Sequence, residues 1–170
     1  MKTTQRTDVT VRPAAAADVA AITEIYNEAI LTTTATFDTE ATTTELRLKW
    51  FEAHDDRHPI LVAEIDGTVV GWASLSPWSE RKAYDDTAET SSYVKDGYRN
   101  AGIGRKLKEA IIEEARQHRF HTLIARIAEG SDASLHLNES FGFVLVGTMK
   151  EVGRKFGKLL DVHILQKMLL

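Results

Sequence analysis

A loop with two glycines, Arg99 to Gly104, lies between a β-rich run and an amphipathic helix, and its backbone is suited to hold an anion. The run before it is Thr90 to Lys95, and after the loop apolar residues recur with the 3.6-residue period of a helix. The first N–H groups of a helix have no intrahelical partner, and the peptide dipoles favour negative charge there. Gly102 and Gly104 carry no β-carbon that would keep an anion away from those groups. The loop is therefore a candidate phosphate site.

Three types of phosphate-binding loop differ in the spacing of their glycines. A dinucleotide site needs G-x-G-x-x-G, and this chain has Leu107 where the third glycine belongs. A P-loop matches two glycines but then requires Lys-Ser/Thr, where the chain has Ile103-Gly104. The pattern Q/R-x-x-G-x-G/A is met by Arg99, Gly102 and Gly104. An ordinary glycine turn is the alternative that this loop alone leaves open.

This third pattern resembles the acyl-coenzyme A loop of the GNAT acetyltransferase superfamily, whose N–H groups wrap the coenzyme A pyrophosphate. Within that superfamily the chain looks like the phosphinothricin N-acetyltransferase group, which includes enzymes acting on methionine sulfoximine. The resemblance implies acetyl transfer from acetyl-CoA, in a ternary complex, to the α-amine of a small amino acid or analogue with an anionic or polar head group. The segments that carry it are Ile25-Tyr26-Asn27, Thr36-Phe37, Trp50-Phe51, Pro59 to Glu64, Pro77-Trp78, Ala83-Tyr84, Thr87 to Val94, Leu135 to Phe143 and Asp161.

The resemblance also implies three groups of cofactor contacts. Backbone groups of Ser92, Tyr93 and Val94 should bond the pantetheine arm, and an N–H near position 92 should polarise the thioester carbonyl. Plain packing is an equal alternative for Tyr93. A later helix start should add Ser131 and Ser134. The pyrophosphate should be held by Arg99, Asn100, Ala101, Gly102, Ile103, Gly104 and Arg105. Acetyl-CoA is the only cosubstrate expected, and no metal is.

Glu89 matches the family's catalytic acid and is the candidate general base. An α-amine with a pKa near ~8 is mostly protonated at neutral pH, so a carboxylate must take its proton before it attacks. A solvated glutamate at a strand end is the alternative. Asn138 stands where most relatives carry Tyr or His, and it can donate a hydrogen bond to the leaving thiolate but no proton. A functioning enzyme is still expected, because a thiol is a good leaving group.

For the acceptor, the resemblance implies contacts from a loop and from the strand after it. Arg81 matches an arginine of the phosphinothricin group, and a guanidinium forks onto carboxylate or phosphinate oxygens. A solvated charged loop is the alternative reading. Phe37, isolated in a threonine-rich loop, should line the acceptor pocket, and Trp78 could equally belong to the core. The remaining expected contacts are Lys82, Tyr84, Thr90 and Ser91.

Hydrophobic periodicity and turn signals predict an α/β (α+β) protein: a mixed, mostly antiparallel sheet of about seven strands flanked by four helices. This order is also that of the GNAT fold, which splays at the strand that binds acetyl-CoA. The second helix is predicted to begin with Thr42 as its cap, three residues before Glu45. Predicted strands are 9–12, 60–65, 69–75, 88–95, 122–128, 143–149 and 159–169, and predicted helices are 15–31, 42–54, 104–115 and 133–141.

Composition restricts the class of protein. The 170 residues fit one domain spanning 1–170, and the 43% hydrophobic and 27% charged shares are ordinary for a soluble globule. With no cysteine, acyl-cysteine catalysis and thiolate metal sites are excluded. The formal charge of −4 argues against nucleic acid, and no apolar run suits a membrane span, so a cytoplasmic enzyme is expected. The resemblance further implies a homodimer.

Two other functions stay open at this point. The first is acetylation of another primary amine, such as a peptide N-terminus or a polyamine. A polyamine would favour a carboxylate-rich pocket, and the loop at 79–84 offers Arg81 and Lys82 against Glu80. The second is a coenzyme A binding module without catalysis, which Asn138 makes conceivable and Glu89 argues against.

Overall fold

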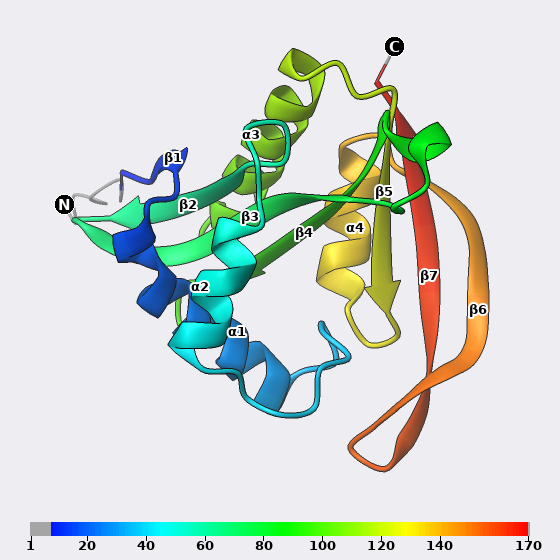
Figure 1. The fold of residues 1–170 in the computed structure, drawn as a ribbon. Coiled ribbons are helices and arrows are strands. Elements are labelled where there is room, and N and C mark those ends of the chain that lie inside the picture. The colour runs from blue at the N-terminus through cyan, green and yellow to red at the C-terminus, as the bar shows by residue number, and fades with distance from the viewer. Residues whose placement is uncertain (1–7, 170) are drawn as a thin grey trace, which may run out of the picture.

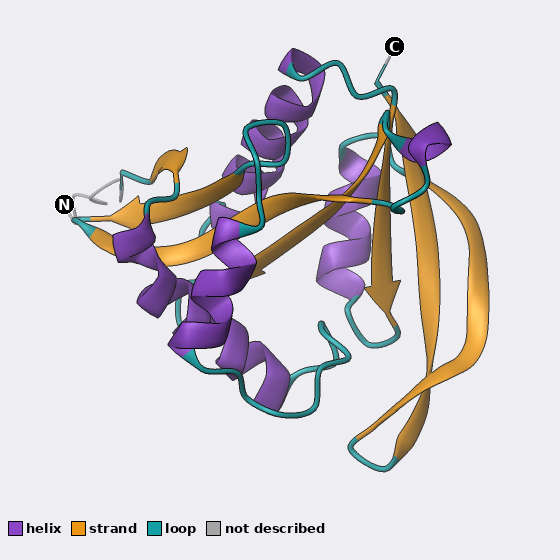
Figure 2. Cartoon of the chain, viewed as in Figure 1, coloured by secondary structure: helices purple, strands orange, loops and turns teal. Residues whose placement is uncertain are grey.

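The computed structural model describes residues 8–169, which form a seven-stranded sheet in the order β1-β2-β3-β4-β5-β7-β6 (Figures 1 and 2). All neighbouring strands are antiparallel except β4 and β5. The expected mixed, mostly antiparallel sheet is thereby confirmed. The strands are β1 (Thr10–Pro13), β2 (Ile60–Ile65), β3 (Thr68–Pro77), β4 (Thr87–Val94), β5 (Thr122–Ala128), β6 (Val144–Lys155) and β7 (Lys158–Met168).

Four α-helices cover the two faces of this sheet (Figure 1). One core packs α3 against β2 to β5, and partly buried residues of α4 join it. A second core on the opposite face packs α1 and α2 against β2 and β3 around Trp72. No helix among residues 8–169 has the length and apolar character needed to cross a membrane. The helices are α1 (Val19–Thr32), α2 (Thr44–Glu52), α3 (Ile103–Gln117) and α4 (Asp132–Ser140), with 3₁₀ turns η1 (Ala16–Asp18) and η2 (Lys82–Tyr84).

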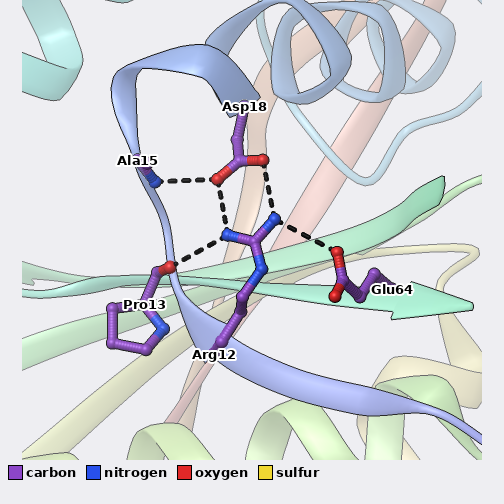
Figure 3. Close-up of polar contacts among 5 residues, drawn as sticks. All are labelled: Arg12, Pro13, Ala15, Asp18 and Glu64. Carbon is purple, nitrogen blue, oxygen red and sulfur yellow. Dashed lines mark hydrogen bonds and ion pairs between the residues drawn. The ribbon is translucent and has the colours of Figure 1, made fainter. Parts of the chain in front are cut away.

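A network around Arg12 fixes the entry into α1 (Figure 3). The Arg12 guanidinium donates to both Asp18 oxygens, at 2.7 and 2.9 Å, and to Glu64 Oε2 on β2 at 3.1 Å. Asp18 also accepts from the Ala15 N–H at 2.7 Å, which satisfies a donor at the helix start. The bond from Arg12 lowers the pKa of the Asp18 carboxyl. The pair therefore ties β1, β2 and the first turn together.

Several boundaries differ from the sequence prediction: α1 begins at Val19 after the turn η1, β3 continues to Pro77, and two further differences have a local cause. The side chain of Thr43, not Thr42, caps α2 by accepting from the Leu46 N–H. Either threonine is close enough to the helix start to act as its N-cap, and the sequence alone does not show which of the two has the required backbone conformation. Strand β6 runs to Lys155 instead of ending near Met149, because shifts of register absorb its glycines as bulges. The β6–β7 hairpin is therefore long, and its pairing continues to Lys155 opposite Lys158 at the turn.

Strands β4 and β5 diverge, and this divergence positions the site. Their pairing ends with Glu89 opposite Ile124, although β4 continues to Val94 and β5 to Ala128. On its other side β4 stays paired with β3 as far as Val94 opposite Gly71. The second half of β4 consequently has one edge that β5 does not occupy. The splay expected at this strand is confirmed.

Candidate active site

A cavity of about 990 Å³ follows the open edge of β4 to the start of α3. Its walls are the end of α1, the loop after it, the turn between β5 and α4, and the tip of the β6–β7 hairpin. Most of the residues expected to hold the cofactor line it. They are Ser92, Tyr93, Val94, Arg99, Asn100, Gly102, Gly104, Arg105, Ser131 and Ser134.

The start of α3 closes one end of this cavity. Gly102 is the N-cap with φ +79°, a left-handed conformation that glycine adopts without strain, and no side chain caps the helix. The first bond of the helix runs from Lys106 N–H to Gly102 O. The N–H groups between them have no intrahelical acceptor and point along the helix axis. This end of the cavity can therefore accept an anion.

Two arginines flank the same helix start. Arg105 donates to Ser140 Oγ of α4 at 2.9 Å and lies 5.0 Å from the centre of the Phe141 ring. Arg99 pairs with Glu28 of α1 at 3.8 Å. Both side chains are exposed on the cavity side, so their charge is available to a phosphate.

The smaller cavity, about 450 Å³, adjoins the larger one, since Ala35 and Tyr93 line both. It lies where β4 and β5 separate. Of the residues expected to contact the acceptor, Phe37, Thr90 and Ser91 line it, and so does Glu89. Its other lining residues come from α1, the loop after α1, β5, β6 and β7: Tyr26, Thr36, Asp38, Arg126, Ala128, Met149, Val152 and Val162.

The carboxylate of Glu89 is held by an arginine of the neighbouring strand. Arg126 of β5 donates from Nε to Oε2 and from Nη2 to Oε1, the latter at 2.8 Å. The bond to Glu89 raises the pKa of the Arg126 guanidinium. The guanidinium centre lies 5.8 Å from the Trp78 ring centre. A fork of this kind fixes both the position and the orientation of the carboxylate.

The loop from 33 to 38 forms a wall of both cavities and is held from several sides. The Tyr26 hydroxyl contacts Thr36 Oγ1 at 3.0 Å and donates to Asp38. Burial, followed by the bond to Asp38, raises the pKa of Tyr26. The buried Lys155 of β6 donates to the Thr36 carbonyl at 2.8 Å. A Cβ at Gly153 would collide with the Phe37 ring, so that ring packs directly on the backbone of β6.

Several expected site residues lie outside both cavities. Asn138 is 3% exposed, and its Nδ2 donates to Ser134 O one turn earlier in α4 at 2.8 Å. The side-chain amide of Asn138 is therefore bonded to the backbone of its own helix, and Asn138 does not line either cavity. Arg81 precedes η2, and Lys82 and Tyr84 belong to it; all three are exposed in the loop beyond the end of β3. Ala101 and Ile103 of the anion loop also lie outside the cavity lining, and Ile103 is in the core.

Sequence reasoning missed four polar residues of the smaller cavity: Tyr26, Thr36, Asp38 and Arg126. A signal existed for Arg126, because it interrupts the otherwise apolar strand β5, and a charge there is costly unless it is paired or exposed. Asp38 lies in a polar loop, where carboxylates are common. Tyr26 has the spacing of a core residue of α1, so the sequence around it did not predict that its hydroxyl would contact Thr36 and Asp38.

Comparison with known proteins gives a consistent result. The family model described as "Acetyltransferase (GNAT) domain" matches residues 11–164. The L-methionine sulfoximine/L-methionine sulfone acetyltransferase of Salmonella typhimurium is 41% identical over 159 residues, 93% of this chain and 93% of that protein. The phosphinothricin N-acetyltransferase of Streptomyces viridochromogenes is 37% identical over 163 residues, 96% of this chain and 89% of that protein. The structure of yncA from Salmonella typhimurium with its cofactor acetyl-CoA superimposes with a TM-score of 0.92 at 40% identity, covering 95% of this chain and 94% of that one.

Proposed function

The chain belongs to the GNAT acetyltransferase family, and from this premise we propose that it transfers acetyl from acetyl-CoA to the α-amine of a small amino acid with an anionic or polar head group. It is an acyltransferase with acetyl-CoA as its cosubstrate. The relatives named for methionine sulfoximine, methionine sulfone and phosphinothricin support this class of acceptor.

The observation that carries the proposal is the position of Glu89. It lies at the last paired residue before β4 and β5 diverge and lines the cavity that adjoins the larger one. A pantetheine arm bonded along the free edge of β4 would deliver its thioester to this junction. An acceptor amine in the smaller cavity would then lie between the thioester and the carboxylate.

The reaction follows as direct attack in a ternary complex. Glu89 takes the proton of the acceptor ammonium, the free amine attacks the thioester carbonyl, and an N–H near Ser92 stabilises the oxyanion. Collapse of the tetrahedral species breaks the C–S bond, and the nitrogen gives its second proton to the departing coenzyme A thiolate or to water, which leaves a neutral amide. Because Asn138 bonds within its own helix and lies outside the cavities, we assign the thiolate no proton donor from that position.

The pyrophosphate is proposed to lie at the start of α3, between Arg99 and Arg105. The left-handed Gly102 cap and the unpaired helical N–H groups support this assignment. The homodimer expected from the resemblance stays a prediction. The consecutive exposed side chains Val144, Leu145 and Val146 on the edge strand β6 support it, and sedimentation of the purified chain tests it.

Thiol release from acetyl-CoA with L-methionine sulfone or L-phosphinothricin as acceptor tests the function. Glu89→Gln should lower kcat by about 10²- to 10⁴-fold and leave the affinity for coenzyme A unchanged. Glu109→Gln, the same change at an exposed position of α3, is the matched control and should leave kcat unchanged.

Turnover by Glu89→Gln equal to that of the wild type across the pH range would remove Glu89 as the base. A wild-type protein that binds coenzyme A but releases no thiol with any amino acid would instead favour the non-catalytic module.

A further inference from the structure

The pair between Glu89 and Arg126 leaves the arginine more accessible than the glutamate. The Arg126 side chain is 54% exposed, whereas that of Glu89 is 16% exposed. Both line the same 450 Å³ cavity. A ligand that enters the cavity can therefore contact the guanidinium directly, beside the less exposed Glu89.

The guanidinium has two edges that can each bind a carboxylate through a pair of hydrogen bonds. The edge formed by Nε and Nη2 already holds Glu89. Within residues 8–169 no hydrogen bond is formed by Nη1, so the edge formed by Nη1 and Nη2 is open to a second anion. Arginine presents five donors in a rigid plane and can hold two carboxylates side by side.

Charge in the cavity makes Arg126 the natural recognition group for an anion. Among the described lining residues it is the one cation, and it shares the cavity with two carboxylates, Glu89 and Asp38. The basic residues Arg81 and Lys82 lie outside the cavity at the start of η2. An acceptor carboxylate in the cavity would be repelled by both acids unless it contacted Arg126.

We propose that the free edge of Arg126 binds the α-carboxylate of the acceptor and thereby selects amino acids over other amines. In an α-amino acid the carboxylate and the amine are attached to the same carbon atom. A carboxylate on one edge of the guanidinium therefore brings the amine beside the Glu89 carboxylate on the other edge. This inference rests on the proposed function and adds a residue that determines its specificity.

The test compares two acceptors that differ only at the carboxyl group, L-methionine sulfone and L-methionine sulfone amide. Arg126→Met keeps the length of the side chain and removes its charge. It should lower kcat/KM for the amino acid by about 10- to 100-fold, mainly through KM, since hydrogen bonds to charged groups contribute about 1.5–3 kcal/mol. The value for the amide should fall by a clearly smaller factor, because the amide shares only the loss that comes from releasing the Glu89 carboxylate from the fork.

Arg126→Lys is the matched control, because it keeps the charge beside Glu89 and loses the planar fork. The kcat/KM of Arg126→Lys for L-methionine sulfone should lie between that of the wild type and that of Arg126→Met. Coenzyme A affinity should be equal in all three proteins, because Arg126 does not line the larger cavity. Equal losses with both acceptors would mean that Arg126 acts through Glu89 or through the fold, and would overturn the inference, as would no loss with either.

Binding separates this inference from the proposed function. L-methionine sulfone is titrated calorimetrically into the protein saturated with coenzyme A, which needs no turnover. If the wild type binds it and Arg126→Met binds it about 10-fold more weakly or worse, the inference stands even where no acetyl transfer is detected. Equal binding by both proteins, or no binding by the wild type, overturns it.

Discussion

The two adjoining cavities are built in opposite ways. The larger one owes its anion-binding end to backbone groups at the start of α3, which one contiguous loop provides. The smaller one is lined by side chains from α1, the loop after it and four strands. A site built from backbone in one loop can be found from a short motif, whereas a site built from distant side chains depends on the register of the whole sheet.

This difference also separates the two recognition problems. The pyrophosphate and pantetheine are the same for every acceptor, so one contiguous loop with its backbone groups and flanking arginines can hold the pyrophosphate. The acceptor differs in its head group, and discrimination needs side chains such as Phe37 and Arg126. Changes in one cavity should therefore alter the affinity for coenzyme A, and changes in the other should alter the acceptor constants.

The largest effect is expected where a charge is placed in the backbone-built cavity. Gly102→Asp puts a carboxylate at the N-cap of α3, beside the proposed pyrophosphate. Two like charges about 4 Å apart repel by about 4 kcal/mol at an effective dielectric constant of 20, so coenzyme A affinity should fall by at least about 100-fold. Calorimetric titration with coenzyme A measures it.

Gly102→Asn is the matched control for this change. Asn and Asp have the same shape, both tolerate the left-handed conformation at φ +79°, and both are good N-cap residues. The two variants should therefore fold equally well, and Asn should cost much less affinity. Equal affinities for the Asp and Asn variants would show that no phosphate lies at this helix start.

The second effect concerns β4, the strand that both cavities share. Lys108 of α3 is 2% exposed and donates to Thr90 Oγ1 at 3.1 Å. Burial lowers the pKa of Lys108 to about 8 from 10.5, which corresponds to a cost of about 3 kcal/mol for keeping it charged in the folded state. Lys108→Met should therefore raise the free energy of unfolding by about 3 kcal/mol at pH 7, less the lost bond to Thr90.

The sign of the pH dependence follows from which state binds more protons. Below pH 8 both states are protonated at Lys108, and the cost is fully present. Between about pH 8 and 10.5 the unfolded chain binds more protons than the folded one, so wild-type stability rises with pH and the advantage of Lys108→Met shrinks. Urea unfolding at pH 7 and pH 10 measures this. Lys106→Met, an exposed lysine of the same helix, should show no such change, and a loss of stability in Lys108→Met at pH 7 would contradict the argument.

The sequence predicts the first cavity better than the second for a physical reason. Arg99, Gly102 and Gly104 are neighbours along the chain, so their geometry follows from a loop that opens a helix. Glu89 and Arg126 are 37 residues apart, and they meet because β4 and β5 are parallel with Glu89 opposite Ile124. No local pattern encodes that register. Likewise, the composition of the loop at 79–84 suggested an anion site, but Arg81, Lys82 and Tyr84 do not line either cavity, and their position depends on where β3 ends.

The smallest effect is expected at the contact between Gly153 and Phe37, which shapes the cavity built from side chains. A Cβ at position 153 would collide with the Phe37 ring, and this ring can swing away because it is partly exposed. Gly153→Ala should therefore raise KM for L-methionine sulfone by about 5- to 10-fold and lower the free energy of unfolding by about 1 kcal/mol. Affinity for coenzyme A should stay the same, as measured by calorimetry.

Gly147→Ala on the same strand provides the control, because a Cβ there meets no atom within 4 Å. It should leave the acceptor KM unchanged while making the same chemical substitution in β6. A Phe37→Ala change should already remove the ring, so adding Gly153→Ala to it should raise KM no further. An equal rise in KM from both glycine variants would mean that a stiffer β6 backbone raises KM and that the Phe37 ring does not, because a Cβ at Gly147 meets no atom. If Gly153→Ala still raises KM in the Phe37→Ala background, the contact between Gly153 and Phe37 does not shape the acceptor cavity.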